Sequence, residues 1–261
     1  MSRPLLLGLQ IAVAIAFIGF WHIATATSLL GDVKTMKFFF STPWDVGARV
    51  VKMVAGGEVW YHLGITLTET ILAFVIGAGG GIAIGFWFAR KPLLAAVFDP
   101  YVKAINALPR VVLAPIFALW FGLGIWSKVA LGVTLVFFIV FFNVYQGVRD
   151  VNQNILSNAK MLGMSERQLL RHVYWPSALG WVFSSLHTSV GFALVGAVVG
   201  EYLGSAAGLG YLIHQAEGVF DVTGVFAGMA ILMVFVIIID SCVTLIENRL
   251  LVWKPGETKT G

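Results

Sequence analysis

Long apolar runs separated by short polar segments dominate the pattern along this chain. Six runs approach or exceed the length of a helix that crosses a ~30 Å hydrocarbon core, and they cover residues 5–26, 63–89, 111–123, 129–148, 179–203 and 225–246. The third run is short and contains Pro115, so it crosses only if it recruits residues before Pro109. The pattern predicts an all-α membrane protein with about six transmembrane helices.

The first run permits two interpretations, since Arg3 followed by apolar residues is also how a secretory signal peptide begins. The run is longer than the apolar part of a signal peptide, and no small-residue cleavage site follows a short apolar stretch. We interpret residues 1–30 as a retained first transmembrane helix. An outer segment at 31–60, a membrane core at 61–254 and a polar tail at 255–261 follow.

The outer segment contains the signals of a helix start. Thr42 suits the N-cap, Pro43 the first helical position and Asp45 the positive end of the helix dipole. Valines share one face of this helix, whose expected end is Gly56: Val46, Val50, Val51 and Val54. An amphipathic helix at the outer interface is therefore predicted.

A polar, basic loop at residues 150–178 interrupts the apolar pattern. Its first helical run ends at Gly163, a candidate C-terminal stop. Ser165 and Gln168 have the spacing of a capping box, which starts a second helix. Pro176 closes the loop or opens the span that follows. The loop is therefore expected to contain a helix, a turn and a second helix.

Composition supports a membrane protein and excludes several other classes. Hydrophobic residues make up 59% of the chain and charged residues 11%, whereas soluble domains contain about 25% charged residues. The single Cys242 excludes an intrachain disulfide and a cysteine metal cluster. The chain has no GxxxxGK[ST] phosphate loop, and its five His residues show no His-x-x-x-His spacing. We therefore expect no ATP site, no metal site, no cofactor and no catalytic residue in this chain.

Glycines concentrate in the second run, at Gly77, Gly79, Gly80, Gly81 and Gly85. A dinucleotide-binding loop is excluded, because these residues lie inside a membrane-length apolar run and not at a strand-to-helix turn. Small residues allow transmembrane helices to approach closely, so the second run is expected to pack tightly against a neighbour.

Positive charge indicates the orientation of the chain. The net charge of +4 is dispersed between the apolar runs, which argues for membrane topology and against nucleic-acid binding. With the N-terminus inside, twelve of the 17 Lys and Arg residues fall in inner segments and five in outer segments. The positive-inside rule therefore predicts cytoplasmic N- and C-termini and a cytoplasmic loop at 150–178.

Polar side chains within the runs are candidates for a transport pathway or gate: Asn106, Trp120, Asn143, His187 and Glu201. Each has an alternative role. Asn106 fits a Pro-kinked packing helix, and Trp120 fits an interfacial aromatic belt. Asn143 fits a helix bulge, His187 a hydrogen bond between helices, and Glu201 an ion pair at the interface.

The loop resembles the EAA loop of permease subunits of binding-protein-dependent ABC importers. Ala159, Gly163, Val173 and Pro176 fall on that pattern in register. Departures from the pattern occur where it has Glu, Ala and Leu: Ser157, Asn158 and Trp175.

The resemblance extends over residues 40–254 and is strongest to the nitrate, sulfonate and taurine branch. The matching segments include Pro109, Ala114-Pro115, Leu119-Trp120-Phe121-Gly122, Gly200-Glu201 and Gly208-Leu209-Gly210. Glu69 stands where that branch usually has an Arg.

This resemblance implies a type I ABC importer permease in a bacterial inner membrane. The residues that would couple it to a separate ATPase are Ala159, Lys160, Met161, Leu162, Gly163 and Pro176. The implied partners are two ATP-binding subunits, which hold the ATP and Mg, a second permease copy in a homodimer, and a soluble substrate-binding protein. The implied substrate is a small anion such as a sulfonate, taurine or nitrate.

Two other classes compete with this interpretation. A secondary transporter or channel would work without ATP, and would show paired discontinuous helices in two related halves. A membrane-embedded enzyme would show convergent catalytic groups. The sequence shows neither an internal repeat nor such a set of groups.

Overall fold

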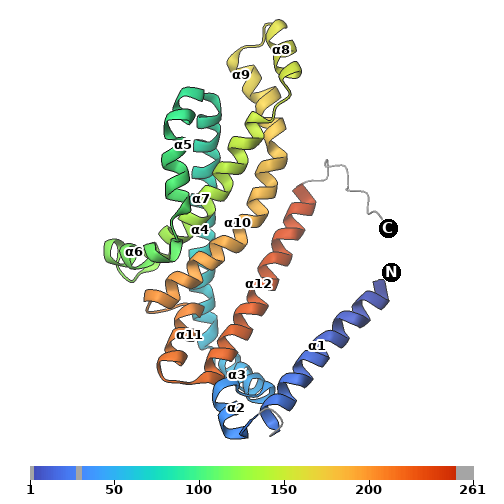
Figure 1. Cartoon of the computed structure of the whole chain (residues 1–261), viewed down its shortest axis with the longest axis vertical. Helices are drawn as coiled ribbons and strands as arrows, with labels where there is room; N and C mark the ends of the chain where they lie inside the picture. Colours follow the sequence, from blue (N-terminus) through green and yellow to red (C-terminus); the bar gives the residue numbers. More distant parts are fainter. Residues whose placement is uncertain (1–2, 28–30, 251–261) are drawn as a thin grey trace.

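The computed structural model describes residues 3–27 and 31–250, and this part of the chain consists of helices and their connections (Figure 1). The helices are α1 (Arg3–Ala26), α2 (Val33–Phe40), α3 (Pro43–Ala55), α4 (Glu58–Arg90), α5 (Pro92–Ala107), η1 (Arg110–Leu113), α6 (Ala114–Phe121), α7 (Ile125–Arg149), α8 (Gln153–Met161), α9 (Glu166–Leu169), η2 (Leu170–Tyr174), α10 (Trp175–Gly204), α11 (Leu209–Gly218) and α12 (Val222–Leu250).

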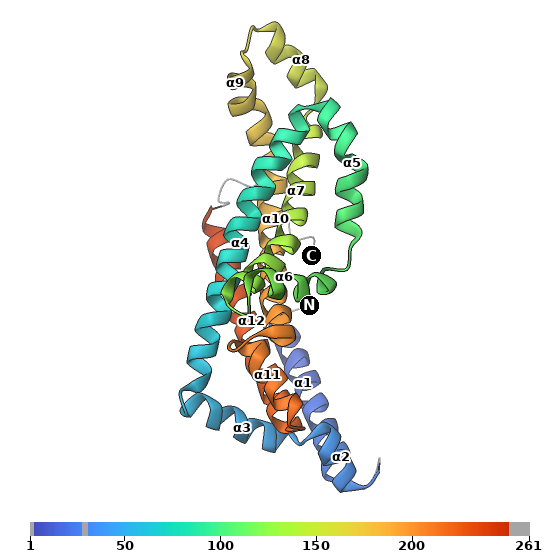
Figure 2. The ribbon, with the colours of Figure 1, turned by 90° about the vertical axis from the view of Figure 1, so that its left-hand side faces the viewer.

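The long helices α4, α7, α10 and α12 run roughly along the long axis of the molecule, and several short helices lie at its two ends. Figures 1 and 2 place α8 and α9 at one end of the long axis and α2, α3 and α11 at the opposite end. We call these the α8 end and the α11 end. Five described helices are long and apolar enough to cross a membrane, or six if one bent pair counts as a span.

The centre of the bundle is α4, α7 and α10, and glycines bring these helices together. A Cβ on Gly81 of α4 would lie 2.8 Å from Val140 Cβ of α7, and Gly77 and Gly85 meet Val136 and Val144 in the same way one turn to either side. These three glycines, spaced four residues apart, thus form a groove on α4 that receives three valines of α7. The expected tight packing is confirmed for these three glycines, whereas a Cβ on Gly79 would meet no atom within 4 Å.

The third predicted span is a bent pair of helices on either side of Pro109. The stretch before Pro109 is the helix α5, with Pro100 inside it, and α5 meets the η1–α6 segment at 87°. Pro cannot donate the backbone bond that would continue a straight helix, so the chain turns at Pro109. The third run is thus paired with the helix before Pro109, which the sequence analysis required for a crossing, and the size of the bend is the part that the sequence did not indicate.

The α11 end matches the predicted helix start in detail. The Thr42 hydroxyl accepts a bond from the Asp45 backbone N at 3.1 Å, and Pro43 occupies the first turn of α3. The sequence did not indicate α2 or α11, which are only 8 and 10 residues long.

The first span, α1, stands apart from the central helices (Figure 1). It is tied to the α11 end through Trp21, whose indole N donates to the Phe40 carbonyl at 3.2 Å and whose ring lies 5.7 Å from that of Phe226 in α12. No residue in the most apolar window of α1 is buried within this chain.

Candidate coupling loop and pathway residues

The first helix of the loop ends as the sequence predicts. Gly163 follows α8 with φ of +76°, which favours glycine. Its N–H donates to the Lys160 carbonyl at 3.0 Å, and the next N–H, of Met164, donates to the Ala159 carbonyl at 3.1 Å. This pair of bonds is a Schellman motif, which satisfies the last carbonyls of α8 while reversing the chain.

The second helix begins at the predicted capping box. Ser165 accepts from the Gln168 backbone, and the Gln168 side chain accepts from the Ser165 N–H at 2.8 Å. The helix then continues through the π turn η2 into α10, so that Pro176 lies in the first turn of α10. The second helix is therefore the start of the fifth span and not a separate short helix.

The loop has a small hydrophobic core of its own, and its tip lies outside that core. Ala159, Leu169 and Val173 are buried against one another together with Val151. At the tip, Met161 is 79% exposed and Leu162 is 81% exposed. Two adjacent apolar side chains are thus presented to the outside on a turn that is internally fixed.

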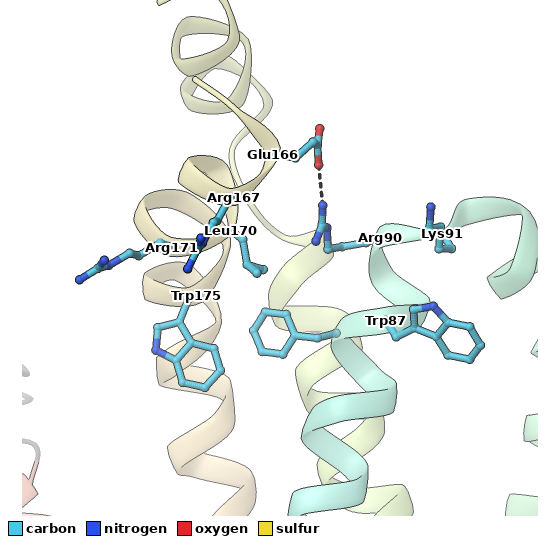
Figure 3. A pocket seen from close by; sticks show the side chains of 9 residues that line it. Trp87, Arg90, Lys91, Glu166, Arg167, Leu170, Arg171 and Trp175 are labelled. Carbon is cyan, nitrogen blue, oxygen red and sulfur yellow. Dashed lines mark hydrogen bonds and ion pairs between the residues drawn. The ribbon is translucent and has the colours of Figure 1, made fainter. Parts of the chain in front are cut away.

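Two contacts join the start of α9 and α10 to α4 (Figure 3). Arg90 donates to Glu166 at 2.6 Å. Below this pair, the rings of Phe86 and Trp175 stack with centroids 5.2 Å apart. The start of α9 and α10 is therefore in direct contact with the end of the central helix α4.

Among the pathway candidates, Glu201 is completely buried at the α11 end. Its carboxylate accepts from the Thr66 hydroxyl of α4 at 2.6 Å and from the Gly210 backbone N at 2.7 Å. Thr66 in turn accepts from the Leu209 N–H at 2.9 Å. Glu201 thus fastens the start of α11 to the central helices.

Two further ionisable side chains accompany Glu201, and each is only 1% exposed: Glu69 and Lys128. Glu69, Glu201 and Lys128 are close enough to one another to interact electrostatically, and one buried oxygen of Glu69 has no hydrogen-bond partner among the described residues. The Lys128 ammonium donates to the carbonyls of Leu123 and Gly124. From the sequence, Glu69 was only a departure from a related pattern and Lys128 a residue of an outer turn, so the cluster was missed.

The other four candidates lie on α5, α6, α7 and α10 and have separate surroundings. The Asn106 side-chain oxygen accepts from Arg110 at 2.7 Å, and Asn143 donates to the Ile139 carbonyl of its own helix at 2.8 Å. Trp120 is 68% exposed. His187 lines an apolar cavity of about 240 Å³, and its Nε2 is 4.0 Å from Asp240.

Comparison with known proteins gives consistent results. Residues 81–252 match the family described as binding-protein-dependent transport system inner membrane component. The chain is 32% identical to an aliphatic sulfonates transport permease protein of Bacillus subtilis, over 82% of this chain and 77% of the relative. It is 37% identical to a formylaminopyrimidine transport permease protein of Halalkalibacterium halodurans, over 75% of this chain and 78% of the relative.

The fold is also similar to that of solved transporters. A crystal structure of an amino acid ABC transporter contains a chain with a TM-score of 0.61 and 22% identity, covering 76% of this chain and 97% of the other. The family match spans more than half of the chain, and it includes the loop with Gly163 and Pro176. The chain therefore belongs to the inner membrane components of binding-protein-dependent transport systems, and it is a permease subunit of an ABC importer.

Proposed function

We propose that the tip of the loop, Met161-Leu162-Gly163, docks into a separate ATPase subunit and transmits its movements to the membrane helices. The observation that carries the proposal is the exposure of Met161 and Leu162, at 79% and 81%, on a turn fixed by the Schellman motif. Exposed apolar side chains on a rigid projection are typical of a protein contact. Ala159 and Lys160 belong to the same docking helix.

The internal structure of the loop supports transmission as well as docking. Ala159 is buried against the residues that continue into α10, and Arg90 holds Glu166 from the end of α4. A displacement of α8 would therefore reach two helices of the central bundle. Pro176, in the first turn of α10, marks the junction with the membrane span.

The complete importer would contain two copies of this chain as a homodimer, two ATPase subunits and a soluble binding protein. We place both termini and the α8 end in the cytoplasm of a bacterial cell and the α11 end outside, on the distribution of Lys and Arg. The polar candidates Asn106, Trp120, Asn143, His187 and Glu201 remain proposed pathway or gate positions within this assembly.

The docking role is tested by retention of the ATPase during purification. The full chain is co-expressed with the ATPase subunit of its transporter and extracted in detergent, as wild type and as Leu162→Asp. A charge in an apolar contact carries a desolvation cost, so we expect Leu162→Asp to lose most of the ATPase. Gln153→Asp is the matched control, because it adds the same charge at the first residue of the same helix.

Retention of the ATPase by Leu162→Asp at the wild-type level would contradict the docking proposal. Absence of any ATPase from the wild-type preparation, with transport persisting in cells depleted of ATP, would favour the alternative, which is an ATP-independent secondary transporter or channel.

We further propose a small anion, such as a sulfonate, taurine or nitrate, as the transported substrate. The proposal is supported by the similarity to the sulfonates permease, which extends over 82% of this chain. Uptake of labelled taurine, an alkanesulfonate and nitrate is measured in cells that carry the complete transporter. Uptake of a formylaminopyrimidine in place of these anions would overturn this assignment and leave the docking proposal intact.

A further inference from the structure

A basic pocket lies between the end of α4 and the start of α9 and α10, next to the loop core (Figure 3). Its volume is about 1100 Å³, which exceeds the size of a typical small-molecule site of roughly 300–1000 Å³. The residues that line it are Phe86, Trp87, Arg90, Lys91, Glu166, Arg167, Leu170, Arg171 and Trp175.

The pocket contains more positive charge than its single carboxylate can balance. Glu166 is bound by Arg90 at 2.6 Å. Within the described ranges, Lys91, Arg167 and Arg171 form no salt bridge, and all three are exposed. Arg167 and Arg171 lie one turn apart on the side of α9 and η2, whereas Lys91 lies beyond Arg90 on the side of α4 (Figure 3). Two neighbouring unbalanced cations therefore line one side of the pocket, as in sites that bind phosphate groups.

The wall of the pocket toward the centre of the molecule is aromatic. Phe86 and Trp175 stack across it, and the exposed fractions of Trp87 and Trp175 are 54% and 41%. Trp87 lies within one turn of the end of α4, and Trp175 is the first residue of α10. Partly exposed Trp at such a position is typical of the boundary between hydrocarbon and headgroups.

We propose that this pocket binds the phosphate of an anionic phospholipid, with Arg167 and Arg171 at the phosphate and Trp175 beside the upper acyl chains. The combination of cations above an exposed aromatic wall fits a molecule that is anionic at one end and apolar at the other. Basic pockets between transmembrane helices are suited to such headgroups.

The proposal is tested on the full chain in detergent by native mass spectrometry, with dioctanoyl phosphatidylglycerol and dioctanoyl phosphatidylcholine as probes. Wild type is expected to prefer the anionic probe by about tenfold or more. The double variant R167Q/R171Q is expected to weaken phosphatidylglycerol binding by about tenfold to thirtyfold, at roughly a fivefold loss per cation. R167K/R171K retains both charges and is expected to retain most of the binding.

The matched control is K34Q/K37Q, which removes two cations from α2 at the α11 end, far from the pocket. It is expected to bind phosphatidylglycerol as wild type does. Equal binding by wild type and R167Q/R171Q, or an equal loss in K34Q/K37Q, would overturn the proposal.

Two competition experiments separate the lipid from other anionic occupants. Displacement of phosphatidylglycerol by millimolar inorganic phosphate would show a site for small soluble anions and overturn the lipid assignment. Displacement by the purified ATPase subunit would show that the pocket is part of a protein contact, and would equally overturn it. Retention of the lipid in both cases supports the proposal, and the phosphate result does not depend on whether Leu162 docks into the ATPase.

Discussion

The two ends of the bundle differ in which side chains they bury and which they expose. At the α11 end, Glu69, Lys128 and Glu201 are ionisable groups with at most 1% of their surface exposed. At the α8 end, Met161 and Leu162 are apolar groups with 79% and 81% exposed. Polar groups are thus inside at one end, and apolar groups are outside at the other.

The two ends also differ in whether their side chains find contacts within this chain. Glu201 is satisfied within the chain, by the Thr66 hydroxyl and the Gly210 N–H. The loop satisfies its own backbone through the Schellman motif and its own core, and leaves only the tip uncovered. The α11 end therefore satisfies its polar groups within the chain, whereas the α8 end leaves two apolar side chains uncovered.

The largest effect on stability is expected from Glu201→Ala. Removing the carboxyl group leaves the buried Gly210 N–H without an acceptor, breaks the bond between α10 and Thr66 of α4, and takes away a group that interacts electrostatically with the buried Lys128. Loss of one partner of a buried charged network costs about 3–5 kcal/mol. Thermal unfolding in detergent measures the change.

The control for this variant is Glu217→Ala, which removes an exposed carboxylate that accepts from the Tyr202 hydroxyl. It is expected to cost about 1 kcal/mol or less. Equal destabilisation by the two variants would mean that the buried cluster does not hold the α11 end together.

The next largest effect is expected from Gly196→Ala, at the contact between α10 and α7. A Cβ there would clash with Gly132 Cα and lie 2.8 Å from Gly132 N, which is backbone and cannot rotate away. Overpacking of this kind costs about 1–3 kcal/mol. The matched control is Gly191→Ala on the same helix, where a Cβ meets no atom within 4 Å. Similar melting temperatures for the two variants would contradict the close approach of the helices.

The elements that the sequence predicted are those determined by neighbouring residues. The Thr42 cap, the Gly163 stop and the Ser165–Gln168 capping box each involve residues within five positions of one another. Apolar runs predicted the spans for the same reason, since length and composition are local properties. The need of the third span for the residues before Pro109 was predicted, but its 87° bend was not, because that bend depends on how the chain packs around Pro109.

The buried cluster could not be predicted in the same way. Thr66 and Glu201 are 135 positions apart, and Gly208 reaches back 146 positions to His62. Only the packing of α4, α7 and α10 brings these residues together. Glu69 and Glu201 could have indicated such a cluster, since an ionisable residue inside a membrane-length run requires a partner.

A smaller effect is expected where a charged pair is not buried. Arg49 of α3 donates to Asp221 at 2.6 Å, but their side chains are 40% and 30% exposed. Ion pairs open to water contribute about 0.2–1 kcal/mol. We expect Arg49→Gln to lower the free energy of unfolding by no more than this, with Lys34→Gln as a control for loss of charge alone. A loss as large as that of Glu201→Ala would show that charge pairing, and not burial, decides the stability of the α11 end.

The smallest effect on stability is expected from the double substitution of Met161 and Leu162 by Ala. Both side chains lie outside the loop core, so their removal uncovers no cavity in the isolated permease. Surface substitutions of this kind change stability by about 0.5 kcal/mol or less. Thermal unfolding of the permease without its ATPase is the measurement, with Ala159→Asp as the contrasting change inside the loop core. Marked destabilisation by the double Ala variant would mean that the tip is covered within its own chain, and the contrast between the two ends would fail; an unchanged melting temperature would leave the tip as a surface whose contacts come from elsewhere.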